Sequence, residues 1–451
     1  MSTRQLHLNA FIYPAGHHEA AWRHPRSQPH RIFDADYYQE IGKAAEAALF
    51  DAVFFADGPA LRSEAAYSTA GRLEPITVLG AIAAATERIG LIATASTTYY
   101  EPYNLARLFS TLDFVSKGRA GWNIVTTSTD AAAENFGLTA HPDPAQRYKR
   151  AAEFVDAATR LWDSWEDDAV VLDRENGQYA DTDKIHRAEF VGEHLSVRGA
   201  FNAPRSPQGY PVLVQAGASN DGRAFAARYA EAIFTAHQSL ANAQAFYSDI
   251  KSQAKGLGRN PDHIKILPGL SPFIADTETA AKELEREFNE LTVPAYGLKQ
   301  IRGLADVDLS ALDLDAPVPL DAFGEAGNVT DNTRSRKQVV AEIVAKERPT
   351  VRRLLHRLAG ARGHRVFAGT PEQVADTIEE WFTSGAADGF NVMPPYYPGG
   401  LTDFTEHVVP ILQRRGLFRT EYTGTTLRDH LGLPRPENQF AIRQASAQSA
   451  S

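Results

Sequence analysis

Cysteine is absent from the 451-residue sequence, and so is any long apolar segment. The absence of cysteine excludes disulfides, thiolate nucleophiles and cysteine-ligated zinc or iron–sulfur centres. No stretch approaches the roughly 20 uninterrupted apolar residues of a membrane-spanning helix. The opening residues Met-Ser-Thr-Arg-Gln also lack the apolar core of a secretory signal peptide. We therefore expect a soluble protein of the cytoplasm.

Basic residues are in deficit. Lysine and arginine together number 46, against 56 aspartates and glutamates, which gives a formal net charge of −10. Such a surface repels phosphate backbones and anionic lipids, so we expect neither a nucleic acid nor a membrane partner. With 43% hydrophobic and 23% charged residues, the composition is otherwise that of an ordinary globular protein. The exception is the tail 439–451, rich in alanine, serine and glutamine, which we expect to be disordered.

Short apolar runs alternate with segments of helical period along most of the chain. The apolar runs have the length of buried strands and lie at residues 6–13, 52–56, 89–95, 120–125, 212–216, 232–235, 264–270 and 389–393. The helical patterns lie at residues 35–49, 75–86, 102–116, 222–229, 240–256, 277–291, 371–384 and 404–415. Because the strands number eight and helices separate them, the sequence predicts an α/β fold, a (β/α)8 TIM barrel, rather than an open sheet.

Three segments do not fit a minimal barrel: residues 128–146, 167–210 and 292–365. We expect a single domain over residues 1–438 that carries them as insertions. The insertions are expected at the carboxyl-terminal face of the barrel, where lids usually lie.

Polar residues follow several predicted strands abruptly, and in a parallel barrel those strand ends face the active site. Asp57 could accept a hydrogen bond from a heterocyclic N–H, and a helix cap or turn is the alternative. Residues 96–99 place four hydroxyls at the next strand end, which would be costly in a core. Asn123 lies inside an apolar strand, where an unpaired amide would cost about 1–3 kcal/mol. We therefore expect a ligand or a neighbouring side chain to satisfy it.

Two loops offer further candidates. The segment 215–223 joins a strand end, a turn of small residues and a helix start, so its N–H groups and Ser219 could bind a phosphate. A simple helix cap by Ser219 is the alternative. His17 and His18 follow the first strand in a histidine-rich loop. This loop has neither His-Glu-x-x-His nor His-x-His spacing, so we expect no metal site.

With these residues in view, the chain resembles a known family. The resemblance covers nearly the whole chain, in motifs that follow one another in the family's order. They include Gly16-His17-His18, Ser96-Thr97-Thr98-Tyr99, Gly121-Trp122-Asn123, Gln215-Ala216-Gly217 and Arg362-Gly363-His364. The family is that of the bacterial luciferase-like flavin monooxygenases. Within it, the chain is most similar to the branch of nitrilotriacetate monooxygenase component A, dibenzothiophene sulfone monooxygenase and long-chain alkane monooxygenase.

This resemblance implies a pocket for reduced FMN at the carboxyl end of the barrel. By motif match the flavin contacts are Asp57, Ser96, Thr97, Asn123, Tyr148 and Ser219, with Ser219 at the phosphate. His17 is the candidate catalytic residue, donating a hydrogen bond or a proton to the substrate or the peroxide. No metal is implied.

The resemblance also implies a two-component reaction. A separate NAD(P)H:FMN reductase supplies FMNH₂, and O₂ adds to the flavin as a C4a-hydroperoxide that oxygenates a small organic substrate. No Gly-x-Gly-x-x-Gly fingerprint opens a helix in this sequence, so the chain is not expected to reduce its own flavin. Relatives are commonly assembled, which implies a homodimer or homotetramer.

One departure from the family pattern and two alternative functions remain. Relatives often carry a histidine four positions before the tyrosine that corresponds to Tyr148, whereas Pro144 holds that place here. His141, three residues upstream, is a candidate substitute.

The alternatives are an F420-dependent oxidoreductase of the same superfamily and a non-catalytic flavin-binding protein. The sequence does not select a substrate among chelates, sulfur compounds and alkanes.

Overall fold

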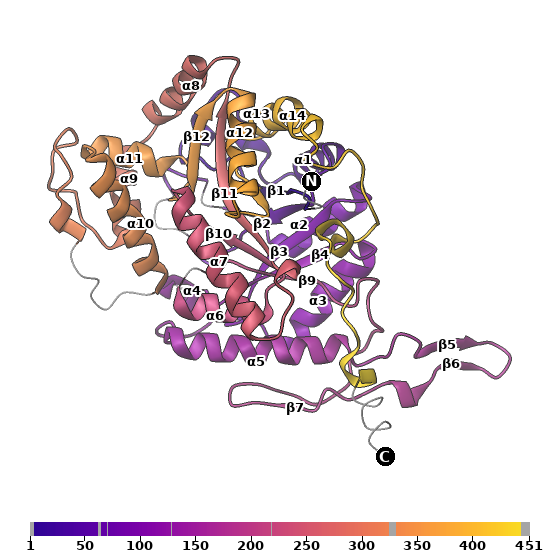
Figure 1. The fold of residues 1–451 in the computed structure, drawn as a ribbon. Helices are drawn as coiled ribbons and strands as arrows, with labels where there is room; N and C mark the ends of the chain where they lie inside the picture. The colour runs from indigo at the N-terminus through magenta and orange to yellow at the C-terminus, as the bar shows by residue number, and fades with distance from the viewer. Residues whose placement is uncertain are drawn as a thin grey trace.

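The computed structural model describes residues 4–61, 65–69, 71–127, 129–217, 219–323 and 331–442 (Figure 1). Its centre is a closed barrel of parallel strands. Around the barrel the strands follow the order β1, β2, β3, β4, β9, β10, β11 and β13, and β13 returns to β1. These strands are β1 (His7–Ile12), β2 (Ala52–Phe55), β3 (Gly90–Ser96), β4 (Ala120–Val125), β9 (Val212–Gln215), β10 (Ala232–Thr235), β11 (Lys265–Ile274) and β13 (Gly389–Val392). The predicted (β/α)8 TIM barrel is therefore confirmed.

Helices surround the barrel, and most of them begin where the sequence supplies a cap. The Glu74 side chain accepts hydrogen bonds from two backbone N–H groups at the start of α2, and Thr370 forms a capping box with Gln373 at the start of α12. The helices are α1 (Ala35–Ala47), α2 (Pro75–Ala85), α3 (Pro102–Val115), α4 (Asp130–Asn135), α5 (Pro144–Trp162), α6 (Asn220–Tyr229), α7 (Leu240–Gly256), α8 (Glu278–Glu290), α9 (Pro294–Ala305), α10 (Asp331–Glu347), α11 (Val351–Ala359), α12 (Pro371–Thr383), α13 (Gly399–Asp403), α14 (Val409–Arg414) and α15 (Leu427–Leu431). In the described chain no helix combines the length and apolar character that crossing a membrane would require.

The interior of the barrel is filled with side chains. Phe11, Phe54 and Phe234 contact one another there, with ring centroids 4.7 to 5.7 Å apart. Helix α15 closes the amino-terminal end of the barrel, because its buried Leu427 and Leu431 join this interior cluster. A Cβ atom at Gly90, the first residue of β3, would lie only 2.4 Å from Leu427 Cδ1. The open end of the barrel is therefore the carboxyl-terminal one.

Five strands lie outside the predicted set. Strand β12 (Arg365–Gly369) pairs in parallel with the second half of β11, from Leu270 to Ile274. This pairing is possible because β11 is ten residues long and outruns the barrel. The other four form two antiparallel pairs, β5 (Val170–Asp173) with β6 (Gln178–Ala180) and β7 (Phe190–Val191) with β8 (Ser196–Val197).

The three inserted segments lie at two different ends of the barrel. Residues 129–146, 292–323 and 331–365 lie at the carboxyl end, where Ala359 accepts a hydrogen bond from Glu19 N in the loop after β1. The segment 167–210 lies instead at the amino-terminal end, and its Gln208 amide donates to the carbonyl of Ala120, the first residue of β4, at 2.7 Å. This segment connects α5 to the start of β9, and the parallel strands of the barrel all start at its amino-terminal end.

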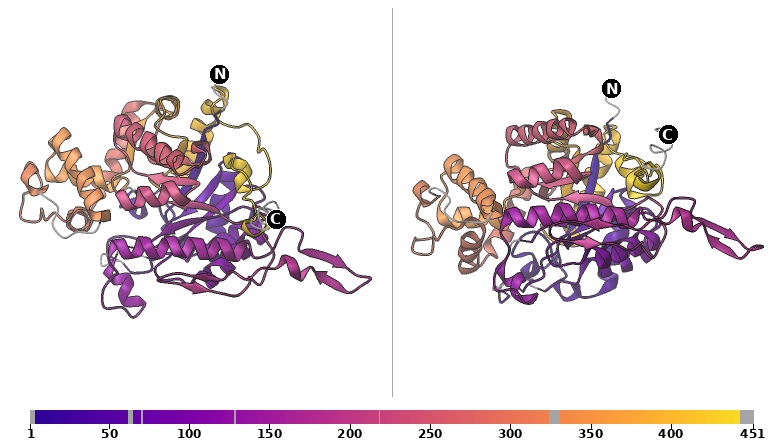
Figure 2. Two further views of the ribbon diagram at one scale, coloured as in Figure 1. Left: turned by 60° about the horizontal axis from the view of Figure 1, so that its bottom comes forward. Right: turned by 90° about the horizontal axis from the view of Figure 1, so that it is seen from below.

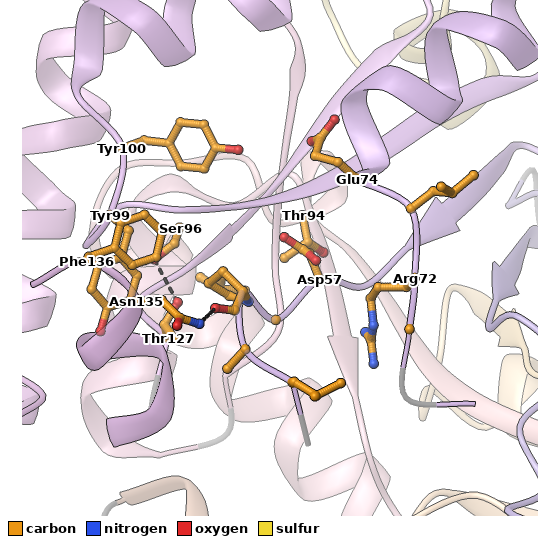
Figure 3. A pocket seen from close by; sticks show the side chains of 17 residues that line it. Asp57, Arg72, Glu74, Thr94, Ser96, Tyr99, Tyr100, Thr127, Asn135 and Phe136 are labelled. Atoms are coloured by element: carbon orange, nitrogen blue, oxygen red, sulfur yellow. Dashed lines mark hydrogen bonds between the residues drawn. The ribbon is translucent and has the colours of Figure 1, made fainter. Parts of the chain in front are cut away.

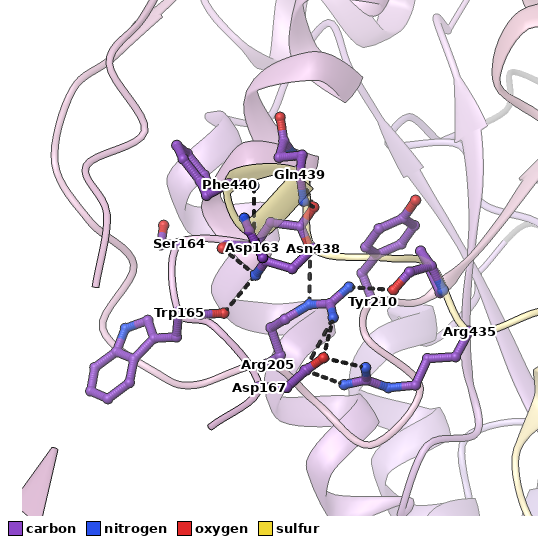
Figure 4. Close-up of polar contacts among 12 residues, drawn as sticks. Asp163, Ser164, Trp165, Asp167, Arg205, Tyr210, Arg435, Asn438, Gln439 and Phe440 are labelled. Carbon is purple, nitrogen blue, oxygen red and sulfur yellow. Dashed lines mark hydrogen bonds and ion pairs between the residues drawn. The ribbon is translucent and has the colours of Figure 1, made fainter. Parts of the chain in front are cut away.

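The segment 167–210, called the arm, carries two hairpins, and Figure 2 shows that the hairpin of β5 and β6 projects from the barrel. The hairpin of β7 and β8 lies along α5, where the Glu153 carboxylate accepts hydrogen bonds from three of its backbone N–H groups. Its base is fastened to the C-terminal segment by a network of ion pairs and hydrogen bonds (Figure 4). Buried Arg205 lies 2.9 Å from Asp163 and 3.0 Å from Asp167, and Asp167 also pairs with Arg435. Phe440 stacks on His186 of the arm, with ring centroids 4.9 Å apart. Of the tail expected to be disordered, residues 443–451 lie outside the described residues.

A second buried cluster joins the two ends of the chain beneath the barrel. The Asp51 carboxylate, before β2, accepts hydrogen bonds from Leu8 N at 2.7 Å and from Arg419, and it contacts His7 Nδ1 at 2.9 Å. Burial alone would raise the pKa of Asp51, but Arg419 and His7 outweigh it and lower that pKa to about 2. Polar groups at this end of a barrel serve stability.

We expect Asp51→Asn to lower the free energy of unfolding by about 3–5 kcal/mol, because it leaves the buried Arg419 guanidinium without its charge partner. The native carboxylate also adds a pH dependence. Its stabilisation is complete above the unfolded pKa near 4 and is lost as pH falls toward 2. Urea titrations between pH 7 and 2 should show this loss in the native protein and a weaker one in the variant. Asp168→Asn, in the exposed pair with Lys184, is the control, and equal losses in both variants would contradict the account.

Candidate active site

A cavity of about 630 Å³ opens at the carboxyl ends of β2, β3 and β4 (Figure 3). Its walls come from these strand ends, from the loop between β2 and α2, and from the segment after β4. The lining residues are Asp57, Gly58, Pro59, Ala60, Leu61, Gly71, Arg72, Leu73, Glu74, Thr94, Ser96, Tyr99, Tyr100, Val125, Thr127, Asn135 and Phe136.

Asp57 and Ser96, both predicted from the sequence, line this cavity. Burial raises the pKa of Asp57, and the Gly58 backbone N–H and the Arg72 charge oppose that rise. The Ser96 hydroxyl oxygen accepts hydrogen bonds from Thr127 Oγ1 at 2.7 Å and Thr98 N at 3.2 Å. The Asp57 carboxylate is therefore available as a hydrogen-bond acceptor for a bound molecule. The Ser96 hydroxyl oxygen is instead engaged by Thr127 and Thr98, and it links the end of β3 to the segment after β4.

Asn123 is buried directly behind this wall. Its Nδ2 donates to Thr94 Oγ1 at 2.8 Å, and the Thr94 hydroxyl donates to the carbonyl of Phe55 at 2.8 Å. Its Oδ1 is buried and has no hydrogen-bond partner among the described residues. An unsatisfied buried acceptor costs about 1–3 kcal/mol, so this oxygen calls for a donor from outside the protein. Thr94 is the neighbouring side chain that was expected for Asn123. It engages only the amide nitrogen, and the amide oxygen has no partner among the described residues.

Thr97 differs from the other predicted residues. It is fully buried, and both its backbone N and its Oγ1 donate to the carbonyl of Val125, at 2.9 and 3.3 Å. The side chain does not line the cavity. In this structure Thr97 joins β3 to β4 rather than facing the cavity.

Tyr148 and Ser219 form a second group, at the start of α6. Ser219 Oγ accepts a hydrogen bond from Gly222 N at 3.1 Å, so Ser219 is a helix cap. The Tyr148 hydroxyl lies beside the same turn, 3.0 Å from where a Cβ on Gly222 would stand. A serine hydroxyl, a phenol and the positive end of a ten-residue helix thus meet at one point. This arrangement is suited to an anion such as a phosphate.

His17 is fully buried and does not reach the cavity wall. Its Nε2 lies 2.7 Å from the carbonyl oxygen of Phe11, which assigns the proton to Nε2 and leaves Nδ1 as an acceptor. Burial first, and then the charge of Arg362, lower the pKa of His17 to about 3. His17 is therefore neutral at cellular pH and offers a lone pair at Nδ1, which has no hydrogen-bond partner among the described residues.

The backbone places this loop tightly. Gly16 has a φ of +133°, and a Cβ there would lie 2.3 Å from the carbonyl oxygen of Pro395. Only glycine allows this approach between the loop after β1 and the loop after β13. The neighbouring His18 contacts Asn289, and His24 stacks on Phe288, so both are engaged by protein groups.

His141 organises the cavity wall. Its Nε2 lies 2.8 Å from the Thr127 carbonyl oxygen, and its Nδ1 accepts from the Tyr99 hydroxyl at 2.7 Å. The Tyr99 ring then stacks on Phe136 at 4.3 Å. Asn135, next to Phe136, donates to the carbonyl of Pro59 on the opposite wall at 2.9 Å. The segment after β4 is thereby fastened across the cavity.

Several cavity residues were not predicted. Arg72 lies in the loop between β2 and α2, and its guanidinium donates to the Tyr13 hydroxyl at 2.9 Å. Tyr99 is the last of the four hydroxyl residues predicted at the end of β3, whereas Tyr100, next to it, was not singled out. Arg72 and Tyr13 carry no sequence signal, because each is an isolated residue in a loop.

Comparisons with known proteins identify the family of this chain. The luciferase-like monooxygenase family model matches residues 11–388. N-acetyl-S-(2-succino)cysteine monooxygenase of Bacillus subtilis is 48% identical over 97% of this chain and 99% of its own length. Nitrilotriacetate monooxygenase component A of Aminobacter aminovorans is 46% identical over 98% and 99%. The crystal structure of DmoA from Hyphomicrobium sulfonivorans superposes with a TM-score of 0.86 at 33% identity, covering 95% of this chain and 92% of that one. The chain therefore belongs to the luciferase-like monooxygenase family and is a flavin-dependent monooxygenase.

Proposed function

We propose that this protein is the FMNH₂-dependent oxygenase of a two-component system, and that it oxygenates a small organic molecule with O₂. The observation that carries the proposal is the buried Asn123 Oδ1, which has no donor among the described residues and lies behind the cavity that Asp57 lines. Reduced flavin offers ring N–H groups, which match an amide oxygen and a carboxylate.

The remaining predicted residues fit the rest of such a molecule. Tyr148, Ser219 and the start of α6 would hold the phosphate, while Asp57, Asn123 and Ser96 would orient the ring system. Thr97 would act indirectly, by fixing the ends of β3 and β4. When bound, reduced FMN supplies the activation of O₂.

The chain's own contribution is positioning and the exclusion of water. Asn135 and the Pro59 carbonyl join two walls of the cavity, and the end of α11 contacts the loop after β1 through Ala359. Such cover protects a reactive intermediate from solvent. Although His17 does not line the cavity, its Nδ1 would accept a hydrogen bond from a substrate or flavin group that reaches past the cavity wall to the loop after β1.

A separate reductase is the proposed partner. The relative from Aminobacter aminovorans is named component A, which implies at least one further component in its system. The absence of a dinucleotide fingerprint from this sequence supports the same arrangement here. As partners we propose an NAD(P)H:FMN reductase and further copies of this chain in a homodimer or homotetramer.

The first prediction concerns the cofactor. Anaerobic titration should show that the protein binds FMNH₂ more tightly than oxidised FMN, and rapid mixing with oxygenated buffer should show slower reoxidation than for free FMNH₂. Adding an FMN reductase, NADH and a substrate should then couple O₂ consumption to product. Binding of F420 in preference to FMN, or reoxidation at the free rate, would contradict the proposal.

The second prediction separates the two ends of the flavin. Asn123→Ala removes a ring contact and should weaken reduced FMN and reduced riboflavin equally, each by about 10-fold. Tyr148→Phe removes only a hydroxyl near the phosphate site and should weaken FMN alone. Fluorescence or calorimetric titration of both ligands measures the ratio. Asn176→Ala, in the turn between β5 and β6, is the control, and a loss of riboflavin binding in Tyr148→Phe would refute the phosphate assignment.

The third prediction concerns His17. Its pKa near 3 means that no His17 ionisation should appear in the pH dependence of kcat/KM between pH 5 and 8. His17→Gln should lower product yield per O₂ consumed without moving any inflection in that range. An inflection near pH 6–7 that disappears in the variant would show instead that His17 exchanges a proton during turnover.

The free energy of unfolding should fall as pH drops from about 6.5 toward 3, since folding keeps this histidine neutral. The fall should be smaller in His17→Gln.

A further inference from the structure

Arg72 is the single basic side chain among the described residues that line the cavity. One of its guanidinium N–H groups donates to the Tyr13 hydroxyl at 2.9 Å, and its carbon lies 5.0 Å from the centre of the Tyr13 ring. No ion pair to Arg72 occurs in the described part of the chain. A guanidinium carries five N–H donors, and among the described residues only the hydrogen bond to Tyr13 engages those of Arg72.

The acidic residues of the cavity do not neutralise Arg72. The Glu74 carboxylate is occupied at the start of α2, where it accepts from Ile76 N at 2.9 Å and from Thr77 N at 2.8 Å. Figure 3 shows the Glu74 carboxylate and the Arg72 guanidinium pointing in opposite directions. Asp57 lies within electrostatic range of Arg72, yet among the described residues no ion pair joins them. The positive charge is therefore available to a bound molecule.

Tyr13 holds this charge in a fixed place. Its ring lies between two guanidinium groups, Arg72 at 5.0 Å and Arg362 at 4.1 Å. The same ring lies 5.5 Å from His17. Arg72 is therefore anchored beside the loop after β1 that carries the candidate catalytic histidine, and an oriented guanidinium loses less freedom when it binds a planar anion.

We propose that Arg72 binds a carboxylate of the substrate, and that the substrate class is small organic acids. This inference rests on the proposed oxygenase function and adds the substrate class to it. A carboxylate matches the guanidinium fork and can form two parallel charge-assisted hydrogen bonds, which neither an alkane nor an uncharged sulfide can. Tyr13 is the positioning residue, since it acts on the substrate only through Arg72.

Calorimetric titration of the FMN-loaded protein tests this inference. The probes are nitrilotriacetate and N-acetyl-S-(2-succino)cysteine, each with three carboxylates, and the trimethyl ester of each. Arg72→Gln should weaken binding of the acids by about 10- to 100-fold, and Arg72→Lys by less, because lysine keeps the charge but loses the fork. The esters should bind weakly to the native protein and equally weakly to both variants.

Matched controls make the result specific. Arg174→Gln removes the same charge from the exposed turn between β5 and β6 and should leave acid binding unchanged, which excludes a general effect of net charge. Tyr13→Phe keeps the ring but removes the hydroxyl, and it should weaken the acids less than Arg72→Gln does. Both Arg72 variants should keep the melting temperature of the native protein and should still bind FMN. If Arg72→Gln does not fold, two other measurements test the inference. They are the affinity of Arg72→Lys for the acids and the ratio of acid affinity to ester affinity in the native protein.

Three outcomes would overturn the inference: acid binding within twofold of native in Arg72→Gln, equal binding of acid and ester by the native protein, or binding of neither acid by protein that does bind reduced FMN. The last outcome leaves the oxygenase function intact and removes only the substrate class. Conversely, tight acid binding by a protein that ignores reduced FMN would remove the proposed function while leaving Arg72 as a carboxylate site.

Discussion

Closure of the parallel sheet is the constraint on which the rest of the structure depends. Once β13 pairs with β1, all eight barrel strands end at one rim, whatever their order in the sequence. The pairing of β2, β3 and β4 brings Asp57 and Asn123 to one part of this rim, and closure brings the loop after β1 against the loop after β13. The interior phenylalanines and α15 fill the barrel from below, so a bound molecule can enter only at the rim. The cavity exists because this rim is also where the chain leaves the sheet as loops.

Burial, more than charge pairing, determines the protonation states of the ionisable groups at the rim. Desolvation lowers the pKa of His17 to about 3 and that of His18 to about 4, and it raises the pKa of Asp57. Each of these groups is moved toward its neutral form. The histidines therefore stay neutral and act as fixed hydrogen-bonding groups. The contact between His17 Nε2 and the Phe11 carbonyl oxygen keeps the His17 proton on Nε2 across the physiological pH range. The hydrogen bonds of such a site do not change with small shifts in pH. The site is therefore suited to binding an oxygen-sensitive molecule in one orientation.

The sequence predicted the barrel well because each of its strands is an apolar run between helical patterns. The expected places of Asp57 after a strand, Asn123 inside a strand and Ser219 at a helix start agree with the structure, and their roles in binding a ligand stay predictions. It did not predict β12, whose pairing depends on the length of β11, or the hairpins of the arm, whose short strands have little apolar pattern. The position of Thr97 depends on side-chain direction at a strand end, which a one-residue shift reverses. Arg72 and Tyr13 approach each other only through the tertiary fold, so no local pattern could indicate the pair.

The fastening of the C-terminal segment has a consequence for biosynthesis. Arg419 reaches Asp51, α15 seals the barrel, and Arg435 and Phe440 secure the base of the arm. Strands β1 to β4 emerge from the ribosome early, whereas the residues that close the barrel beneath them emerge only after all eight barrel strands. A partly synthesised chain therefore carries an open barrel end with apolar side chains, the state in which chains of this size tend to aggregate. The barrel can be closed from below only once residues 419–440 have been synthesised, so this segment is required to complete the fold.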